Sequence, residues 1–311
     1  MRLSLSTNWF TGRSEDGAEI ADKAVELGFM ELELGYRATE ELAESLRGRI
    51  AVGSVHAFCP APLSAPSAHP ELYPLASFDR EAASLARLQV LRTAEFASGI
   101  GASTVVLHAG RVSFRGLFQR LDTPALLKKL AGCGGAPTHP SYMRMMSRAR
   151  KLRESRGAKL LDSFKSLLAG LIPDLERFAV TLALENLPYF EGFPNERETE
   201  NLLAEFSGAP IAAWFDTGHH HVRRTCGWLS LNRSRLPPGS IRGMHLNDVN
   251  GTEDGHLSPG CGKVDFAALK DMARSAEHVV FEPSSAVSEE ELAEGVAYIR
   301  KIWGENDIIS I

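Results

Sequence analysis

The chain has 311 residues, of which 44% are hydrophobic and 23% are charged, so it is long enough to bury a large core. Its net charge of −5 excludes a general electrostatic attraction to nucleic acid or to membrane surfaces. It has no apolar run of roughly eighteen residues and no signal-peptide pattern, so we expect a cytoplasmic protein without a membrane partner. The four cysteines form no C-x-x-C pair, which argues against a disulfide framework or a thiolate zinc site.

Eight short β-like runs recur along the chain, and nearly all are followed by a stretch with helical spacing of apolar residues. Most are apolar through their centres, as expected for parallel strands covered on both faces. The last predicted helix opens with a capping box at 288–291. The alternation predicts an α/β protein, a single (β/α)₈ TIM-barrel domain over residues 1–311, rather than an open doubly wound sheet. The predicted strands cover residues 3–7, 29–34, 50–57, 103–110, 180–186, 211–218, 241–248 and 278–283.

The spacing between strands is fairly even except between the fourth and the fifth. We predict that residues 111–165 form a basic, helical insertion in the fourth βα loop. This segment holds 13 Lys and Arg residues against three carboxylates, a local charge of +10 that leaves −15 for the rest of the chain. Three interpretations stay open: a solvated helical pair, a lid that binds a phosphate or carboxylate, and a surface that contacts DNA. Arg111, directly after the fourth strand, is the best candidate to bind an anionic group.

Polar residues stand at the C-terminal ends of the third to eighth predicted strands, one apiece. These strand ends converge on the face where active sites of such barrels lie, so we expect the residues to meet in one bowl. Buried carboxylates there are costly unless they are paired or bind a metal. Mixed carboxylate and imidazole ligands suit Mn²⁺, Mg²⁺, Co²⁺ or Zn²⁺. The six residues are His56, His108, Glu185, Asp216, His245 and Glu282, and we predict a divalent metal site at the last four.

Three further residues fall near the same predicted bowl. His219 lies one turn after the sixth strand, and Asp254 and His256 lie in the loop after the seventh strand. They are candidates either for a second cluster of metal ligands or for contacts to substrate hydroxyl groups. His56 and His108 likewise have two interpretations, as metal ligands or as residues that contact the substrate or pack in the core.

Five motifs taken together resemble the xylose isomerase-like superfamily: LALEN, WFDTGH, MHLND, DGHLSPGCGKVDF and the final FEP. Members of this superfamily include sugar-phosphate isomerases and epimerases, inosose dehydratases and the endonuclease IV branch of DNA repair. The resemblance extends from the first strand to the last helix and leaves only residues 111–165 outside it. It assigns a shared divalent metal site to Glu185, Asp216, His245 and Glu282.

The branches of the superfamily imply different chemistry. In the epimerase branch, residues matching Glu185 and Glu282 also form the acid/base pair, which implies proton transfer through a metal-stabilised enediolate. The endonuclease IV branch implies an apurinic/apyrimidinic phosphodiester hydrolase with a multinuclear zinc site. There, a second and a third zinc are held by residues matching His56, His108, Glu185, His219, Asp254 and His256.

The positions of three further residues at the ends of predicted strands make them candidates to contact the substrate. Trp9 and Phe58 are candidates for an apolar wall against a sugar ring, with ordinary packing as an equal alternative. Glu33, at the end of the second strand, is a candidate to hydrogen-bond the substrate or His56. A small sugar or sugar phosphate is the expected partner, nucleic acid belongs to the endonuclease alternative, and a homo-oligomer is compatible with both. A barrel that only senses a polyol is the least favoured reading, because the acid/base pair is intact.

Overall fold

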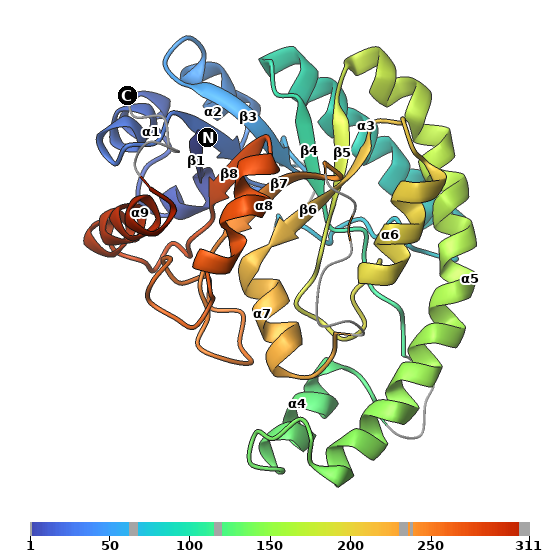
Figure 1. The fold of residues 1–311 in the computed structure, drawn as a ribbon. Coiled ribbons are helices and arrows are strands. Elements are labelled where there is room, and N and C mark those ends of the chain that lie inside the picture. Colours follow the sequence, from blue (N-terminus) through green and yellow to red (C-terminus); the bar gives the residue numbers. More distant parts are fainter. Residues whose placement is uncertain (1, 62–67, 115–119, 230–235, 237–238, 305–311) are drawn as a thin grey trace.

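The computed structural model describes residues 2–61, 68–114, 120–229, 236 and 239–304. Eight strands close into a barrel in chain order, and every neighbouring pair is parallel. This confirms the predicted TIM barrel, and each strand lies within its predicted range (Figure 1). The strands are β1 (Leu3–Ser6), β2 (Glu31–Leu34), β3 (Ala51–His56), β4 (Thr104–Leu107), β5 (Thr181–Glu185), β6 (Ile211–Asp216), β7 (Ile241–Leu246) and β8 (His278–Phe281).

Helices surround the barrel, and most begin at a side chain that accepts a hydrogen bond from the first turn. The predicted capping box between Ser288 and Glu291 is confirmed, and a second one joins Asn195 and Glu198. The helices are α1 (Gly17–Glu26), α2 (Glu40–Leu46), α3 (Arg80–Ile100), α4 (Thr123–Ala131), α5 (Pro140–Phe178), α6 (Glu196–Glu205), α7 (Thr217–Thr225), α8 (Lys270–Ser275) and α9 (Glu289–Trp303), with short 3₁₀ turns at Thr7–Phe10 and Ala267–Leu269.

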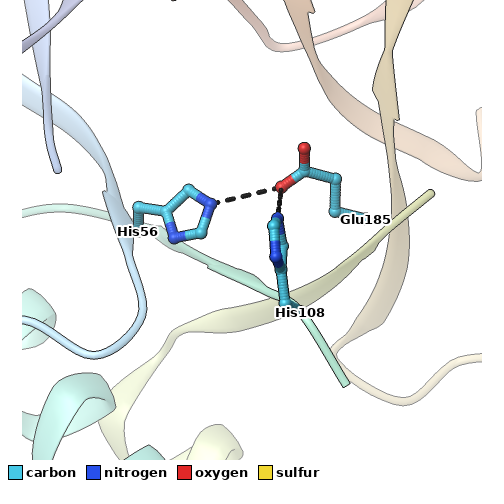
Figure 2. A group of neighbouring side chains, drawn as sticks. All are labelled: His56, His108 and Glu185. Atoms are coloured by element: carbon cyan, nitrogen blue, oxygen red, sulfur yellow. Dashed lines mark hydrogen bonds and ion pairs between the residues drawn. The ribbon is translucent and has the colours of Figure 1, made fainter. Parts of the chain in front are cut away.

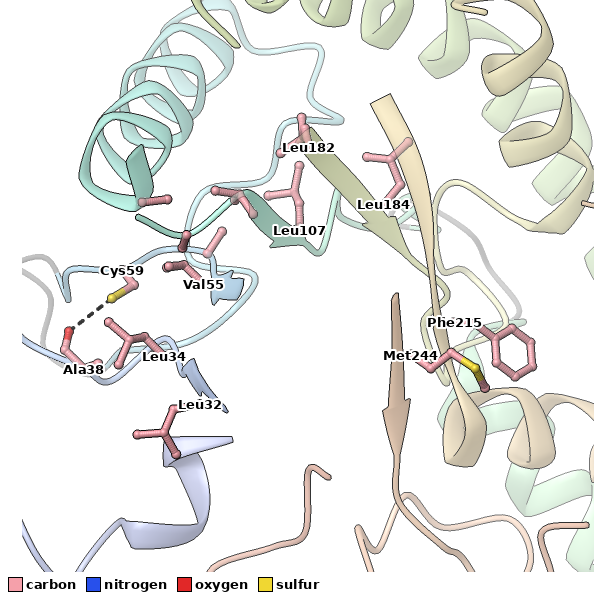
Figure 3. Close-up of a cluster of buried hydrophobic side chains, with 14 of the residues drawn as sticks. Leu32, Leu34, Ala38, Val55, Cys59, Leu107, Leu182, Leu184, Phe215 and Met244 are labelled. Atoms are coloured by element: carbon pink, nitrogen blue, oxygen red, sulfur yellow. Dashed lines mark hydrogen bonds between the residues drawn. The ribbon is translucent and has the colours of Figure 1, made fainter. Parts of the chain in front are cut away.

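Alternation along the strands divides apolar from functional side chains. On β5, Leu182 and Leu184 belong to the large core shared with the surrounding helices, which Figure 3 shows in part. Ala183 belongs instead to a small cluster inside the barrel, with Val106, Trp214 and Val280. Glu185 is two residues after Ala183, so the period of two directs its carboxylate into the barrel at the C-terminal end of the strand.

Two helices, α4 and α5, follow β4 along the chain. Helix α4 lies within the predicted insertion of residues 111–165, and α5 begins within it and ends beyond it. Helix α4 and the first part of α5 extend past the barrel at the bottom of Figure 1, whereas α5 continues unbroken beyond residue 165 to the turn before β5. This projecting part has its own apolar cluster against the end of α7. Tyr142 links the two, since its hydroxyl donates to the Cys226 carbonyl at 2.8 Å and accepts from Trp228 Nε1 at 2.8 Å. No helix in the described part of the chain is long and apolar enough to cross a membrane.

Candidate metal centre

The structure brings together all nine residues that the sequence suggested as metal ligands. They form three groups, and within each group the potential ligand atoms lie within 4.8 Å of one another. We call them the histidine group (His56, His108 and Glu185), the core group (Glu185, Asp216, His245 and Glu282) and the loop group (His219, Asp254 and His256). Glu185 belongs to both the histidine group and the core group. That these nine residues ligate metal ions stays a prediction.

The histidine group is built from β3, β4 and β5 (Figure 2). Glu185 Oε2 lies 3.2 Å from His56 Nε2 and 3.0 Å from His108 Nε2, so both rings converge on one carboxylate oxygen. His56 Nδ1 donates to the Ala57 carbonyl at 3.0 Å, which leaves its Nε2 facing Glu185. All three side chains of the group are buried.

The core group closes around His245. Its Nδ1 lies 3.1 Å from Glu282 Oε2, 3.3 Å from Glu185 Oε1 and 3.7 Å from Asp216 Oδ2. The other ring nitrogen, Nε2, lies 3.0 Å from Glu33 Oε1, and Ser54 donates to Glu33 Oε2 at 2.8 Å. Glu33 is therefore placed behind His245, away from the cavity described below. The position does not favour the predicted contact to substrate, and the partner of Glu33 is His245 rather than His56.

The loop group joins α7 to the loop after β7. Asp254 Oδ2 lies 3.2 Å from His219 Nε2 and 3.5 Å from His256 Nε2. The remaining ring nitrogens donate to backbone carbonyls at 2.8 Å, His219 Nδ1 to Asn186 and His256 Nδ1 to Glu282. Both histidines thus present Nε2 to the same carboxylate. Asp254 is at the rim of the bowl, whereas His219 is buried.

Two asparagines that the sequence reading did not single out hold Asp216 in place. Asn247 Nδ2 donates to Asp216 Oδ2 at 2.6 Å. The side-chain amide of Asn186 pairs with both backbone groups of Asp216, at 2.8 and 3.0 Å. Each asparagine directly or closely follows a predicted ligand in the chain, in LEN and HLN. This proximity to a predicted ligand was the feature of the sequence that could have identified the two asparagines. Asn is also a preferred residue of ordinary turns, so the proximity alone does not indicate a role in the site.

The electrostatics of the three groups fit a divalent cation. No ion pair among the described residues brings a Lys or Arg to their carboxylates. Burial raises the pKa of Asp216 to about 6. Burial alone would raise the pKa of Glu185, but His108 and His245 beside it hold that pKa well below its usual range. Burial alone would lower the pKa of His256, but the Asp254 and Glu282 carboxylates raise it to about 10. Burial would likewise lower the pKa values of His56, His219 and His245, but the neighbouring carboxylates raise them, whereas at His108 burial prevails and the pKa is lowered. In the metal-free protein, the four histidines with a raised pKa thus supply the positive charge.

The orientation of the histidines fits the same ion. Metal-ligating histidines usually donate one ring N–H to an acceptor, which directs the other nitrogen to the metal. Four histidines of the site show this arrangement. In each, one ring nitrogen contacts a carbonyl or carboxylate oxygen that is not itself a potential ligand of its group, and the other nitrogen faces the group. The four are His56, His219, His245 and His256. His108 differs, because its Nδ1 is buried without a hydrogen-bond partner in the described part of the chain.

A cavity of about 380 Å³ lies over the three groups. Of the core group, Glu185 and Glu282 line it, whereas Asp216 and His245 are not among its described lining residues. Its outer part is lined by Asn8, Tyr36, Arg37, His69, Glu71 and Tyr189. A cavity of this size suits a molecule such as a monosaccharide.

Trp9 and Phe58 lie outside the described lining of this cavity. Trp9 is buried, donates from Nε1 to the Val287 carbonyl at 2.9 Å and has the Arg13 guanidinium 4.3 Å above its ring. Phe58 is also buried and contacts Tyr73, with ring centroids 5.0 Å apart. Their positions favour the packing alternative over the predicted wall for a sugar ring. Tyr36 and Tyr189 supply the tyrosine rings in the described lining of the cavity.

Arg111, the predicted anion-binding residue, is paired within the protein instead of being free for an anionic ligand. Its guanidinium lies 3.3 Å from the Tyr189 ring centroid and pairs with Glu71 at 2.7 and 3.0 Å. The predicted anion-binding side chain therefore already has a carboxylate partner. Other basic side chains of the segment are also engaged: Arg153 with Glu198 at 2.6 Å and Arg150 with the Gly227 carbonyl at 2.7 Å.

Comparison with known proteins identifies a matching family model and several similar proteins. A family model described as xylose isomerase-like TIM barrel matches residues 21–302. An uncharacterised protein of Methanocaldococcus jannaschii is 24% identical over 130 residues, a match that covers 41% of this chain and only 42% of that relative. The D-psicose 3-epimerase of Clostridium cellulolyticum, solved with D-tagatose, is 13% identical with a TM-score of 0.62, covering 97% of this chain and 99% of that one. The IOLI protein with a bound zinc atom is 13% identical with a TM-score of 0.64, covering 98% and 99%.

Proposed function

The chain belongs to the xylose isomerase-like TIM-barrel family, and from this premise we propose that it is a metal-dependent isomerase or epimerase of a small sugar or sugar phosphate. One observation carries the proposal: the two glutamates of the core group are the members that line a cavity of monosaccharide size. They come from β5 and the end of β8, so they approach the cavity floor from different strands. Epimerisation requires one group that removes a proton from the bound substrate and one that returns it, and two protein carboxylates facing the same substrate can do both.

In this proposal, Asp216 and His245 hold the metal together with Glu185 and Glu282. A bound divalent ion would polarise the substrate carbonyl and stabilise the negative charge of an enediolate. Glu282 removes or returns the proton α to the carbonyl from one side, and Glu185 does so from the other. Asn8 Nδ2 donates to Glu282 Oε1 at 3.2 Å and orients that carboxylate. The Glu33–His245 contact fixes the ring that both glutamates surround.

A second candidate function is phosphodiester hydrolysis of the endonuclease IV type. The observation that favours it is the presence of the histidine and loop groups beside the core group, which together provide for more than one ion. In that case Glu185, a member of both the histidine group and the core group, would be a ligand in each, and the cavity would receive an extruded abasic sugar. The engagement of Arg111, Arg150 and Arg153 in contacts within the protein leaves fewer charges of the basic segment for DNA.

One experiment separates the two. The protein is loaded with Mn²⁺ or Zn²⁺ and incubated in D₂O with a panel of keto sugars and their phosphates, and loss of the ¹H signal α to the carbonyl is followed by NMR. We expect exchange with at least one substrate, and a loss of about 10³-fold in Glu282→Gln with the fold retained. Absence of exchange throughout the panel, together with cleavage of an abasic-site duplex, would reject the isomerase and support the hydrolase.

A further inference from the structure

Asp248 is a buried carboxylate outside the three groups. It lies two residues after the end of β7 and is 1% exposed. Its Oδ1 accepts the backbone N–H groups of Val249 and Val264, both at 2.9 Å. Its Oδ2 accepts those of Gly260 at 3.0 Å and Gly262 at 2.8 Å. Four N–H donors thus replace the water that burial removes, and none of the described ion pairs gives Asp248 a Lys or Arg.

These hydrogen bonds close a loop that carries two of the loop-group residues. The segment 249–264 leaves β7 and returns to the same carboxylate. The backbone N–H groups of Asp248 and Leu257 each donate to the other's carbonyl at 2.8 Å, which ties the middle of the segment as well. Asp254 and His256 lie just before Leu257. Their positions opposite His219 therefore depend on a segment whose two limbs meet at one aspartate. The segment has other anchors as well, since Ser258 Oγ donates to the Glu291 carbonyl at 2.7 Å and the Ser284 N–H donates to the His256 carbonyl at 2.8 Å.

The return limb is shaped for this carboxylate. A Cβ on Gly262 would come within 2.4 Å of Asp248 Oδ1 and 2.6 Å of the Val249 carbonyl. Gly260 has φ +95°, a backbone conformation that favours glycine. Two glycines thus let the backbone approach both oxygens of Asp248. An asparagine in place of Asp248 would turn its NH₂ group toward two of the four N–H donors. The amide therefore cannot replace the carboxylate as an acceptor of all four hydrogen bonds.

We propose that Asp248 is a positioning residue for the loop group, which it assembles by fixing segment 249–264 in the conformation that sets Asp254 and His256 against His219. The inference rests on the proposed use of the loop group as a metal or substrate site. No described hydrogen bond joins the Asp248 side chain to a residue of the core group or the histidine group, so we expect its largest effect at the loop group.

The test compares Asp248→Asn and Gly262→Ala, which attack the same contact from its two sides, with the matched control Asp265→Asn. Asp265 is exposed and accepts only a 3.3 Å hydrogen bond from Ala268 N within the described contacts. Hydrogen exchange of the metal-free proteins is measured first. We expect the amides of Gly260, Gly262 and Val264 to exchange at least about tenfold faster in Asp248→Asn, and the strand amides to be unchanged. Unchanged protection of these amides in both variants would overturn the proposal.

Zinc titration then distinguishes positioning from a merely structural role. Asp254→Asn replaces the loop-group carboxylate itself by an amide. The zinc that this variant fails to bind is taken as the zinc of the loop group. We expect Asp248→Asn and Gly262→Ala to weaken this zinc by at least about tenfold while the remaining zinc affinity and that of Asp265→Asn match the wild type. A lower melting temperature with unchanged zinc binding would overturn the positioning role. If Asp254→Asn and wild type bind zinc identically, the loop group holds no ion. In that case hydrogen exchange over 250–257 decides whether Asp248 still fixes the segment.

Discussion

The two ends of the barrel pair their carboxylates with different cationic side chains. At the N-terminal end, Arg2 pairs with Glu31 at 3.0 Å and Arg242 pairs with Glu277, so described cations and carboxylates neutralise each other. At the C-terminal end, all described ion pairs of the carboxylates in the three groups are with histidines. The first end pairs its carboxylates with guanidinium groups, which stay charged. The second pairs them with imidazoles, each of which can release a proton and ligate a cation instead.

The largest expected effect comes from Glu185→Gln at the C-terminal end. Glu185 belongs to two groups, so its loss removes a ligand from both and one member of the acid/base pair. We expect turnover to fall by about 10³-fold or more, with metal binding at both groups abolished or strongly weakened. Metal titration and steady-state kinetics measure this, and circular dichroism controls for the fold. Wild-type metal affinity in Glu185→Gln would show that the carboxylates and histidines of these two groups are not a ligand set.

Adding metal should stabilise only a protein with an intact C-terminal end. At a free ion concentration of about 100 times Kd, linkage gives about 2.7 kcal/mol of additional unfolding free energy. We expect the melting temperature of the wild type to rise accordingly, and a chelator to reverse the rise. Arg242→Ala, at the other end, should show the same rise as the wild type. An equal rise in Glu185→Gln would place the stabilising ion elsewhere.

Metal affinity should increase with pH, because His219, His245 and His256 have raised pKa values and carry protons that an ion must displace. The pKa of His256 is raised to about 10, so at neutral pH this ring is protonated and cannot ligate. Between pH 6 and 8 we expect the affinity of the loop group to rise about tenfold per pH unit for each proton displaced. Calorimetry in buffers of different ionisation enthalpy counts the released protons. Affinity independent of pH, with no proton release, would contradict the protonated state.

The smallest effect is expected from Arg242→Ala at the N-terminal end. The variant loses the pair with Glu277 and a 3.2 Å hydrogen bond to Thr104 Oγ1. Because Arg242 and Glu277 are partly exposed, solvent screens their pair, and we expect a loss of at most ~1 kcal/mol in unfolding free energy. Denaturant unfolding measures this, while metal affinity should stay at the wild-type value. A loss of metal binding would show that the two ends are not independent.

The fold could be predicted because its signal is repeated. Eight apolar runs with helical stretches between them are compatible with few architectures, and a period of two along each strand selects which residues enter the barrel. The candidate ligands followed from the same logic. Glu185 and Asp216 end their strands with the side chain on the inner face, and strand ends meet at one mouth whatever their separation in sequence.

The contacts of individual side chains could not be predicted in this way. A register shift between β2 and β3 sets Glu33 opposite Ser54, and this irregularity has no sequence signature that would have placed Glu33 behind His245. Arg111 meets Glu71 and Tyr189 only because two loops from distant parts of the chain fold over the same strand end. Such contacts depend on loop conformation rather than on hydrophobic periodicity.

The most direct test of the proposed metal centre at the C-terminal end is a metal count. Protein stripped by chelator is dialysed against Mn²⁺ or Zn²⁺, and the bound ions per chain are measured by elemental analysis for the wild type, Glu185→Gln and Arg242→Ala. We predict at least one tightly bound ion in the wild type and in Arg242→Ala, and a reduced count in Glu185→Gln. A wild-type protein that binds no ion, or a Glu185→Gln variant that binds as many ions as the wild type, would contradict the metal centre.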